Sequence, residues 1–554
     1  MLKIFNLIKN KKMKISLNFI SFFLIIFSSK QVNTFRCGTD NLKIHPYNIK
    51  PTEEAERRRL AAEYQPIKIY ADYSNLQRPS SVSSQNYQNI LKMIQETLDE
   101  FKKFLLVQHI DIDLSESLSE IKESCEVEEV GNDYAYFLKN NDLVIFPSFY
   151  SQGESVIASA VFCLTYGQRP VGGVLYINPN AIFEKKNNDI YMKNILLHEI
   201  THILVFHPYL FSHYGLMEQR NSVYYITSPK ALLKARQHFN CPSLTGIALE
   251  NQGGSGSVGS HWESRYFLGD YMISHDYYDV VISDITLALF EDSGNYKVNY
   301  YSGGLFKFGK NEGCDFLNKK CIENGALLSR EFCISPRDPI CSSSRQTKGY
   351  CLIYNYSLYG ETIPSQYQYF DNPNYGGFYP VDFCPVPDSY NNDEEYYSDS
   401  CKIGSSSLDS EFGEKIGENS FCFLSTLLPA SSSTTISETQ GICYEVRCDS
   451  SNKRIIISIG SQTITCPTSG GNINNPSGFK GTITCPKYID ICSFKDNVMC
   501  SGLYDCLDKK VGSDPDSYTY DPDDENFIRV DASKHLQFNY FIFYMLFILF
   551  ILYN

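Results

Sequence analysis

The side chains best suited to chemistry in this sequence lie in the segment His198-Glu199-Ile200-Thr201-His202. On a helix, histidines four positions apart lie on the same face, so both imidazoles can reach a single ion. A catalytic zinc ion takes three protein ligands and a water. Glu199 is rotated by roughly 100° from His198 around the helix axis. This rotation keeps its carboxylate off the metal but near the water, so the segment predicts metal-assisted hydrolysis with Glu199 as general base.

This five-residue pattern is short and also occurs by chance. In that case the segment is an amphipathic helix with two histidines packed in the core. A zinc site needs a third protein ligand, and the compact motif HExxHxxGxxH would place it ten residues after the first histidine. Val205 and Pro208 stand at the glycine and third-histidine positions of that motif, and His207 is one residue out of register. The third ligand must therefore come from another segment.

Two downstream residues are candidates for this third ligand. Glu218 would give a thermolysin-type site with two histidines and a glutamate. His261 follows the glycine-rich segment 253–256, which could bring it close to the motif, and Met272 comes eleven residues after His261. We favour His261 and keep Glu218 as the alternative. The remaining downstream histidines are expected at the surface or in packing roles: His213, His238 and His275.

Hydrophobic periodicity indicates the elements that must position these residues. Pro208 ends the helix that carries the motif, because proline cannot continue a helix. The order of strands and helices is typical of an α+β or α/β catalytic domain. The predicted strands are 66–73, 143–146 and 171–177, and the predicted helices are 86–106, the motif helix from Asn188 or Asp189 to about Val205, and 229–238.

The bulk composition indicates a large globular protein of several domains. The chain has 554 residues, of which 43% are hydrophobic and 20% charged, as is usual for folded domains. Its net charge of -14 argues against a nucleic-acid partner, since binding to phosphates requires basic surface.

The cysteines indicate an oxidising compartment. Fifteen of the 19 lie between Cys314 and Cys506, a density typical of loop-rich modules held by disulfides. A set of cysteine zinc sites is the alternative, but paired CxxC spacings do not occur. The odd count predicts at least one cysteine that is unpaired within the chain. One glycosylation sequon, Asn355-Tyr356-Ser357, fits a secreted surface.

Both ends of the chain have the character of targeting segments. The first 30 residues combine a basic start, an apolar stretch at 15–27 and a Ser28-Ser29 end, the pattern of a secretory signal peptide. The segment 538–553 is mostly apolar. It suits either a glycolipid-anchor signal or a single transmembrane helix. We therefore expect the body of the protein on the extracellular face of the plasma membrane.

Changes in composition give the expected domain boundaries. A propeptide-like leader ends near the basic segment Arg57-Arg58-Arg59, and an acidic stalk precedes the hydrophobic end of the chain. The expected parts are a signal peptide at 1–30, a leader at 31–62, a catalytic domain at 63–330 with an insertion at 216–258, a cysteine-rich region at 331–510, a stalk at 511–537 and the anchor segment at 538–553.

Beyond the motif, the chain resembles the leishmanolysin family of metzincin metallopeptidases. The resemblance is carried by Gly259-Ser260-His261-Trp262-Glu263 with Met272, because in that family the third histidine is displaced by an inserted segment and lies in such a motif. Arg169-Pro170-Val171-Gly172-Gly173, leading to Ile177-Asn178-Pro179, also looks like the family. So do 67–76 and Gly313-Cys314-Asp315-Phe316. The similarity covers about residues 37–320 and continues more weakly through the cysteine-rich part.

This resemblance implies a fold and a set of roles. The expected fold class is α+β, with a metzincin-like catalytic domain made of a twisted mixed sheet and the active-site helix, followed by a disulfide-rich, mostly β and loop region. The zinc ligands, one ion per site, would be His198, His202 and His261. Met272 would form the hydrophobic floor under the metal, and Cys37 could hold a zymogen inactive. Extended substrate would pair with an edge strand, for which we expect 171–177.

The chain departs from the family pattern at two places. Val205 replaces the glycine at which the family's helix ends and turns, and a β-branched residue in a left-handed conformation would be strained. The segment around Cys37 resembles the family's propeptide only loosely. The expected function is a secreted or surface-anchored zinc endopeptidase acting on extracellular proteins or peptides. The alternatives are a catalytically inactive relative used in adhesion or as a receptor, and an unrelated disulfide-rich coat protein.

Overall fold

The computed structural model describes residues 45–492 except for short internal segments. These segments are 115–116, 133–136, 151–155, 180, 182–188, 253–256, 276, 278–279, 301–305, 335–339, 389–399, 403–411, 437–438 and 450. The expected signal peptide, Cys37, the stalk and the hydrophobic segment 538–553 lie outside the described residues. Among the helices that are described, a stretch with the length and hydropathy of a membrane span is not found.

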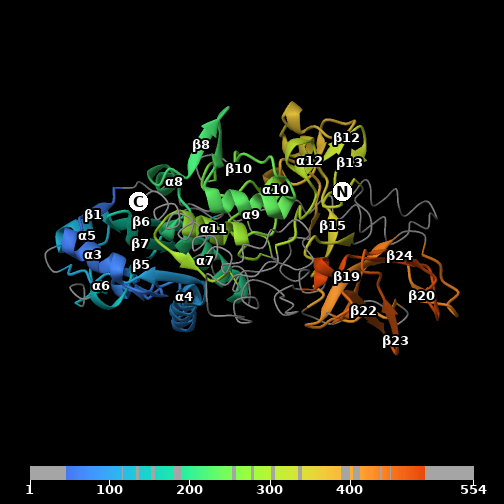
Figure 1. Cartoon of the computed structure of the whole chain (residues 1–554), viewed down its shortest axis with the longest axis horizontal. Coiled ribbons are helices and arrows are strands. Elements are labelled where there is room, and N and C mark those ends of the chain that lie inside the picture. Colours follow the sequence, from blue (N-terminus) through green and yellow to red (C-terminus); the bar gives the residue numbers. More distant parts are fainter. Residues whose placement is uncertain are drawn as a thin grey trace, which may run out of the picture. The chain divides into compact units, whose positions relative to one another are not determined.

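A five-stranded mixed sheet is the central element of the N-terminal part (Figure 1). In order across the sheet, its strands are β1 (Tyr47–Ile49), β6 (Ala158–Tyr166), β7 (Arg169–Ile177), β5 (Leu143–Phe149) and β3 (Ile69–Ala71). β3, β5 and β7 are parallel, β6 is antiparallel to β7, and β1 is parallel to β6. The mixed sheet confirms the expected α+β class.

The expectation that 171–177 is an edge strand is wrong. β7 pairs with β6 along one side and with β5 along the other, so its backbone has no free side for a peptide. A continuous run of buried residues indicates that a strand is covered on both faces. It does not indicate whether the strand lies inside the sheet or at its edge.

Two long helices accompany this sheet. In α4 (Ser84–Phe104), Ser83 caps the first turn by accepting a hydrogen bond from the amide of Asn86 at 3.1 Å. The helix buries one apolar face that includes Ile90, Ile94 and Leu98. The motif helix is α7 (Asp189–Leu204), which packs against α4, β6 and β7. The predicted helix boundaries are therefore correct to within two residues.

A glycine in β7 lets α7 approach the sheet closely. A Cβ atom on Gly173 would lie 2.7 Å from Cγ2 of Ile203 and 2.9 Å from the carbonyl oxygen of Val161. Both distances are shorter than van der Waals contact, so a larger residue would push the helix away from the strand. Gly173 thus helps to set the depth at which α7 lies against the sheet.

The expected insertion contains a β-hairpin and a helix. β8 (Met217–Arg220) and β9 (Val223–Ile226) form the hairpin, and β10 (Ile247–Ala248) pairs with β9. Between β9 and β10 in the chain lies α9 (Pro229–Phe239). This helix ends at Asn240, which has a left-handed backbone conformation. α9 packs on α11 (Asp284–Asp292), where the Asp292 carboxylate accepts hydrogen bonds from the amides of Lys230 and Ala231.

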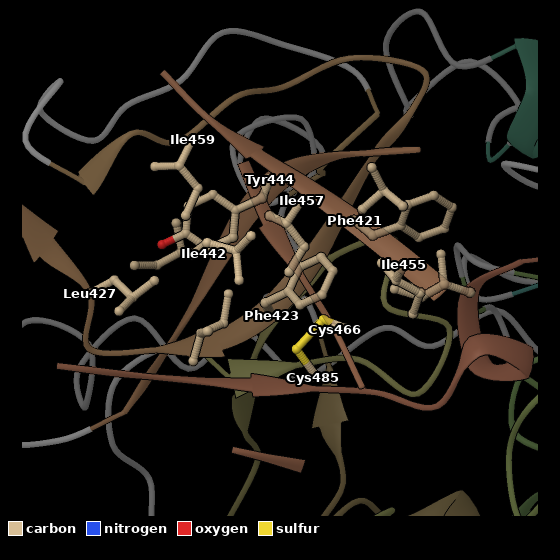
Figure 2. Close-up of a cluster of buried hydrophobic side chains, with 14 of the residues drawn as sticks. Phe421, Phe423, Leu427, Ile442, Tyr444, Ile455, Ile457, Ile459, Cys466 and Cys485 are labelled. Atoms are coloured by element: carbon tan, nitrogen blue, oxygen red, sulfur yellow. A yellow bond between two sulfur atoms is a disulfide. The ribbon is translucent and has the colours of Figure 1, made fainter. Parts of the chain in front are cut away.

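The C-terminal part contains a six-stranded antiparallel sheet. Phe423, Tyr444 and Ile457 are fully buried in its core (Figure 2). In order across the sheet, the strands are β23 (Gln462–Thr465), β22 (Arg454–Ile459), β21 (Gln440–Asp449), β19 (Ser420–Ser425), β26 (Thr482–Cys485) and β24 (Gly471–Asn474).

Further short helices and strands lie along the described chain. The basic segment Arg57-Arg58-Arg59 lies within α3 (Glu53–Ala61). The others are β2 (Tyr64–Pro66), β4 (Leu105–Gln108), α5 (Leu118–Ser124), α6 (Phe137–Asn140), α8 (Pro208–His213), α10 (Ser264–Phe267), β11 (Lys297–Val298), α12 (Cys314–Asn318), β12 (Ile322–Glu323), β13 (Ala326–Leu327), β14 (Ile340–Cys341), β15 (Lys348–Cys351), β16 (Tyr354–Asn355), β17 (Tyr375–Gly376), β18 (Pro387–Asp388), β20 (Leu428–Pro429), β25 (Phe479–Lys480) and α14 (Tyr488–Ile491).

All cysteines in the described part of the chain form disulfides, which confirms disulfides over cysteine zinc sites there. Cys37, Cys500 and Cys506 are outside that part. The eight pairs are Cys125–Cys163, Cys241–Cys314, Cys321–Cys384, Cys333–Cys351, Cys341–Cys422, Cys401–Cys443, Cys448–Cys492 and Cys466–Cys485. Most lie in the C-terminal region, which is therefore disulfide-rich and mostly β and loop, as predicted.

Candidate metal centre

Three histidines that are far apart in sequence come together in the interior. The ligand atoms of His198, His202 and His261 all lie within 4.8 Å of one another. The Nε2 atom of His198 is 3.0 Å from that of His202 and 3.2 Å from that of His261. All three residues are buried. Glu199 is also fully buried, but it does not belong to this group of converging ligand atoms.

The other ring nitrogen of each histidine faces an acceptor. Nδ1 of His198 is 2.7 Å from the carbonyl oxygen of Tyr271, and Nδ1 of His202 is 2.6 Å from that of Phe206. Nδ1 of His261 is 3.2 Å from the carbonyl oxygen of Ser257. A carbonyl oxygen can only accept a hydrogen bond, so Nδ1 of His198 and of His202 carries the proton and their Nε2 atoms present lone pairs. Nδ1 of His261 also lies 2.9 Å from the hydroxyl of Ser260, and donation to the Ser257 carbonyl gives its Nε2 a lone pair as well. Three lone pairs that face one another are the donor set of a cation site.

Burial keeps these rings neutral. Desolvation lowers the pKa of His198 to about 4, against the opposing effect of its hydrogen bond to the Tyr271 carbonyl. Desolvation and the neighbouring histidines also lower the pKa values of His202 and His261 well below the usual value for histidine. Neutral imidazole is the form that binds zinc, so the site requires no deprotonation at neutral pH before it can take a metal.

The helix α7 supplies two of the three rings. Ile200 and Ile203 on the same helix are fully buried against the sheet and the core, which fixes the rotation of α7 about its axis. Thr201 donates its hydroxyl to the carbonyl oxygen of Leu197 at 2.8 Å. With this rotation fixed, the four-residue spacing places His198 and His202 on one face.

Backbone pairing positions the segment that contains His261. Just after β10, Leu249 forms an isolated antiparallel bridge with Trp262, and the amide of Glu250 donates to the carbonyl oxygen of His261 at 2.9 Å. Gly259, just before the histidine, has φ of +81°, a conformation that favours glycine. The end of the inserted segment is thus held by β-type pairing, which places His261 near the histidines of α7.

Trp262 anchors the segment that carries His261. Its ring is fully buried, stacks on Phe267 at 4.9 Å between centroids and meets Phe206 edge to face. Its indole N–H donates to Oγ1 of Thr286 at 2.8 Å. This large buried side chain holds the backbone of its neighbour His261 in place.

Met272 lies in a turn that is tied to both histidine segments. The amide of Trp262 donates to the carbonyl oxygen of Met272 at 3.0 Å. Tyr271, the preceding residue, holds His198 through its carbonyl, and its hydroxyl is 3.0 Å from Oγ1 of Thr201. The turn therefore connects α7 with the segment of His261.

Asp270 organises this turn, although no sequence motif singles it out. Oδ1 accepts from the amide of Met272 at 2.8 Å, and Oδ2 accepts from the hydroxyl of Thr286 at 2.8 Å. Burial raises the pKa of Asp270 to about 6, although these hydrogen bonds oppose the shift. The carbonyl partners of the histidines were also missed, because any residue type supplies a carbonyl.

The other residues considered as ligands lie elsewhere. Nδ1 of His207 accepts from the amide of Tyr209 at 3.1 Å and caps α8. Glu218 is on the hairpin strand β8 and pairs with Arg220. The remaining histidines have other settings: His213 is exposed, Nε2 of His238 is 2.8 Å from the carbonyl oxygen of Phe308, and Nδ1 of His275 is 3.3 Å from Oγ of Ser264.

The end of α7 differs from the expected glycine turn. Val205 is fully buried, and it is absent from the described residues with positive φ. Its amide donates to the carbonyl oxygen of Thr201 at 3.0 Å, and its own carbonyl accepts from the amide of His207 at 3.0 Å. The chain therefore leaves the helix without a left-handed residue at this position, and the expected strain is not present.

Comparison with known proteins supports a relationship across most of the chain. The family model described as Leishmanolysin matches residues 83–499. The leishmanolysin homolog of Crithidia fasciculata is 29% identical over 385 residues, which cover 64% of this chain and 56% of that protein. The leishmanolysin of Leishmania tropica is 29% identical over 376 residues, covering 64% and 55% respectively. The leishmanolysin-like peptidase of Caenorhabditis elegans is 28% identical over 313 residues. The chain thus spans little more than half the length of the first two relatives.

Proposed function

The chain belongs to the leishmanolysin family of peptidases, and from this premise we propose that it is a zinc metalloendopeptidase acting on extracellular proteins or peptides. One observation carries the proposal: the Nε2 atoms of three buried histidines converge while each Nδ1 faces an acceptor. This donor set fits zinc, which binds neutral imidazole and takes three protein ligands in catalytic sites. The ligands of one ion would be His198, His202 and His261.

In this proposal each group of the site has its own role in peptide-bond hydrolysis. When bound, the zinc ion supplies a Lewis acid that polarises the scissile carbonyl and acidifies a water. Glu199 accepts a proton from the attacking water and returns it to the leaving amine. The carbonyls of Tyr271 and Phe206 hold the imidazoles in the orientation and tautomer that binding requires. Met272 provides an apolar floor to the site.

The same proposal places the protein in the secretory pathway. Its support is the apolar stretch at 15–27 and the disulfides of the described chain, which form in oxidising compartments. The segment 538–553 would hold the protein to the outer face of the membrane through a glycolipid or a single helix. We retain the boundaries given above, with a catalytic domain at 63–330 and a cysteine-rich region at 331–510.

We also propose that the leader keeps the enzyme inactive until it is removed. A Cys37 thiolate on the zinc would occupy the position that the attacking water needs. This role rests on the family resemblance and on the odd number of cysteines.

The decisive experiment combines metal analysis with proteolysis of the secreted, leader-free protein. We expect one zinc per chain and chelator-sensitive digestion of casein. Glu199→Gln should lower kcat/KM by about 10²–10⁴-fold, the usual contribution of a general base, and should retain zinc because Glu199 is not a ligand. Glu218→Gln is the matched control, since Glu218 lies on an exposed hairpin and pairs with Arg220, and it should digest casein as fast as wild type.

The outcomes separate the competing functions. Equal digestion by wild type and Glu199→Gln would contradict the assigned mechanism. Bound zinc without any proteolysis in wild type would favour an inactive relative with an adhesion or receptor role. Absence of zinc from the native protein would contradict the metal site itself.

A further inference from the structure

The sequon Asn355-Tyr356-Ser357 is the only Asn-x-Ser/Thr sequence of the chain without proline at the middle position. In the structure Asn355 ends β16 and caps the short 3-10 helix η6 (Tyr356–Tyr359). Its Oδ1 accepts hydrogen bonds from the hydroxyl of Ser357 at 2.7 Å and from the amide of Ser357 at 3.2 Å. The serine hydroxyl of the sequon thus already contacts the asparagine amide, and neither bond uses Nδ2.

The surroundings of Asn355 are open and apolar. Leu358 is 67% exposed, Tyr359 is 45% exposed and Tyr375 is 38% exposed. Tyr375 lies directly opposite Asn355 in the antiparallel pair β16–β17, so the two side chains share one face with their Cβ atoms about 5 Å apart. The exposed ring of Tyr375 thus leaves apolar surface in water directly beside Asn355, and a group attached there would cover it.

The neighbouring residues hold this surface in place. Tyr356 points away from it into a small core with Ile363 and Phe383, and its hydroxyl donates to the carbonyl oxygen of Gly377 at 2.8 Å. Because Tyr356 is buried while Ser357 is exposed, the local fold keeps the sequon at the surface.

We propose that Asn355 carries an N-linked oligosaccharide whose first sugars lie over the ring of Tyr375. In the transfer, Nδ2 of Asn355 attacks the anomeric carbon of a lipid-diphosphate-linked oligosaccharide. The bond from that carbon to the diphosphate oxygen breaks, the lipid diphosphate leaves, and the amide loses one proton. Oδ1 keeps its two hydrogen bonds from Ser357. The inference rests on the secretory localisation in the proposed function, and not on zinc binding or peptidase activity.

The physical gain is the cover of exposed aromatic surface. The flat face of a sugar ring carries C–H groups that pack against an aromatic ring, and the hydroxyl groups on its edges remain in water. An oligosaccharide beside Tyr375 would therefore remove apolar surface from water without a protein partner. Leu358 and Tyr359 lie close enough in the chain to be shielded by the same glycan.

The first test measures the mass of the full chain secreted from a eukaryotic host, before and after treatment with peptide-N-glycosidase. Wild type should lose one oligosaccharide, and treatment in heavy-oxygen water should convert residue 355 alone to labelled aspartate. Asn355→Gln and Ser357→Ala should show no mass change, whereas the conservative Ser357→Thr should keep the glycan. Secreted, disulfide-bonded wild type whose mass is unchanged by the enzyme would overturn the proposal.

The second test addresses the contact with Tyr375. Removal of the glycan should lower the melting temperature of wild type, and it should lower that of Tyr375→Ala by clearly less. Equal shifts in the two proteins would overturn the stacking arrangement. Zinc content and casein digestion of Asn355→Gln should match wild type, so a failure of the peptidase assignment would be visible separately from a missing glycan.

Discussion

At the scale of single residues, the candidate site depends on which ring nitrogen of each histidine is free. Backbone carbonyls take Nδ1, and burial keeps the rings neutral. The three Nε2 lone pairs repel one another unless a cation lies between them. The site is therefore expected to be more stable with metal than without, because a ligand that binds only the folded state stabilises it.

Replacement of His261 should remove the stabilisation that bound metal gives to the folded protein. His261→Ala leaves two ligands from α7, too few for a catalytic zinc site. We expect loss of stoichiometric zinc after dialysis and loss of the increase in melting temperature that zinc gives to wild type. Metal analysis and thermal unfolding with and without zinc measure both effects. His213→Gln, an exposed histidine on α8, is the control and should bind zinc like wild type; equal zinc retention by His261→Ala would argue against the assignment.

At the scale of the elements, the position of α7 follows from small features at its contacts. Gly173 allows the helix to lie close to β7, and the buried Val205 ends it without a left-handed residue. The family glycine at this position would serve a sharp turn, but here the buried valine side chain contributes to the core instead.

Val205→Gly should accordingly lower the stability of the protein, although it introduces the glycine that the family has at this position. The substitution removes a fully buried side chain and adds backbone freedom in the unfolded state. Together these effects should lower the free energy of unfolding by about 2–4 kcal/mol, with no rise in kcat/KM. Denaturant unfolding and casein assays test this. Val205→Ala should lose about 1–3 kcal/mol, from the cavity alone, and a glycine variant as stable as wild type would contradict the buried role of this residue.

At the scale of the whole molecule, disulfides tie segments that are far apart in sequence. Cys241 at the end of α9 is bonded to Cys314 at the start of α12, across 73 residues. The segment between them contains His261, Met272 and α11. Closing this loop covalently restricts the unfolded chain around the candidate site.

Loss of this disulfide should therefore lower the stability of the segment that contains His261. We expect the double variant Cys241→Ser/Cys314→Ser to lose about 4 kcal/mol of stability by the chain-entropy estimate for a loop of this length. Its half-life of peptidase activity on heating should shorten. Cys466→Ser/Cys485→Ser, which opens a bridge of 19 residues in the C-terminal sheet, should leave zinc binding unchanged. Equal heat inactivation of the first variant and wild type would contradict this role.

An ion pair between distant segments gives a pH-dependent prediction. Arg330 donates to Asp490 on α14 at 3.2 Å. Burial raises the pKa of Asp490, but Arg330 and Arg345 outweigh it and hold this pKa below the ordinary value of 3.8. Since the folded pKa is lower than the unfolded one, the pair stabilises the fold above pH 3.8 and this contribution is lost as the pH falls further.

Asp490→Asn should thus cost about 1–2 kcal/mol at pH 7, and this difference from wild type should shrink below pH 3.8. Thermal unfolding at pH 7 and pH 3 measures the difference. Glu445→Gln removes a more exposed pair with Lys415 and should cost no more than about 0.5 kcal/mol. A cost of Asp490→Asn that is the same at both pH values would contradict the ionic origin.

The local features of this protein follow from short stretches of its sequence. The spacing of His198 and His202, the helix that carries them, the buried strands and the disulfide-rich region all follow from periodicity and composition over short windows. His261 could be proposed because its motif and Met272 lie close together in the sequence. Without the family resemblance, however, Glu218 remained an alternative third ligand.

How these parts meet depends on contacts that the three-dimensional structure reveals. It placed β7 inside the sheet, gave Val205 an unstrained helix end, and brought the carbonyl of Tyr271 to His198 across 73 residues. Strand order and backbone partners depend on contacts between distant segments, and a carbonyl group is the same for every residue type. A local pattern therefore specifies which element forms, while long-range packing specifies what that element touches.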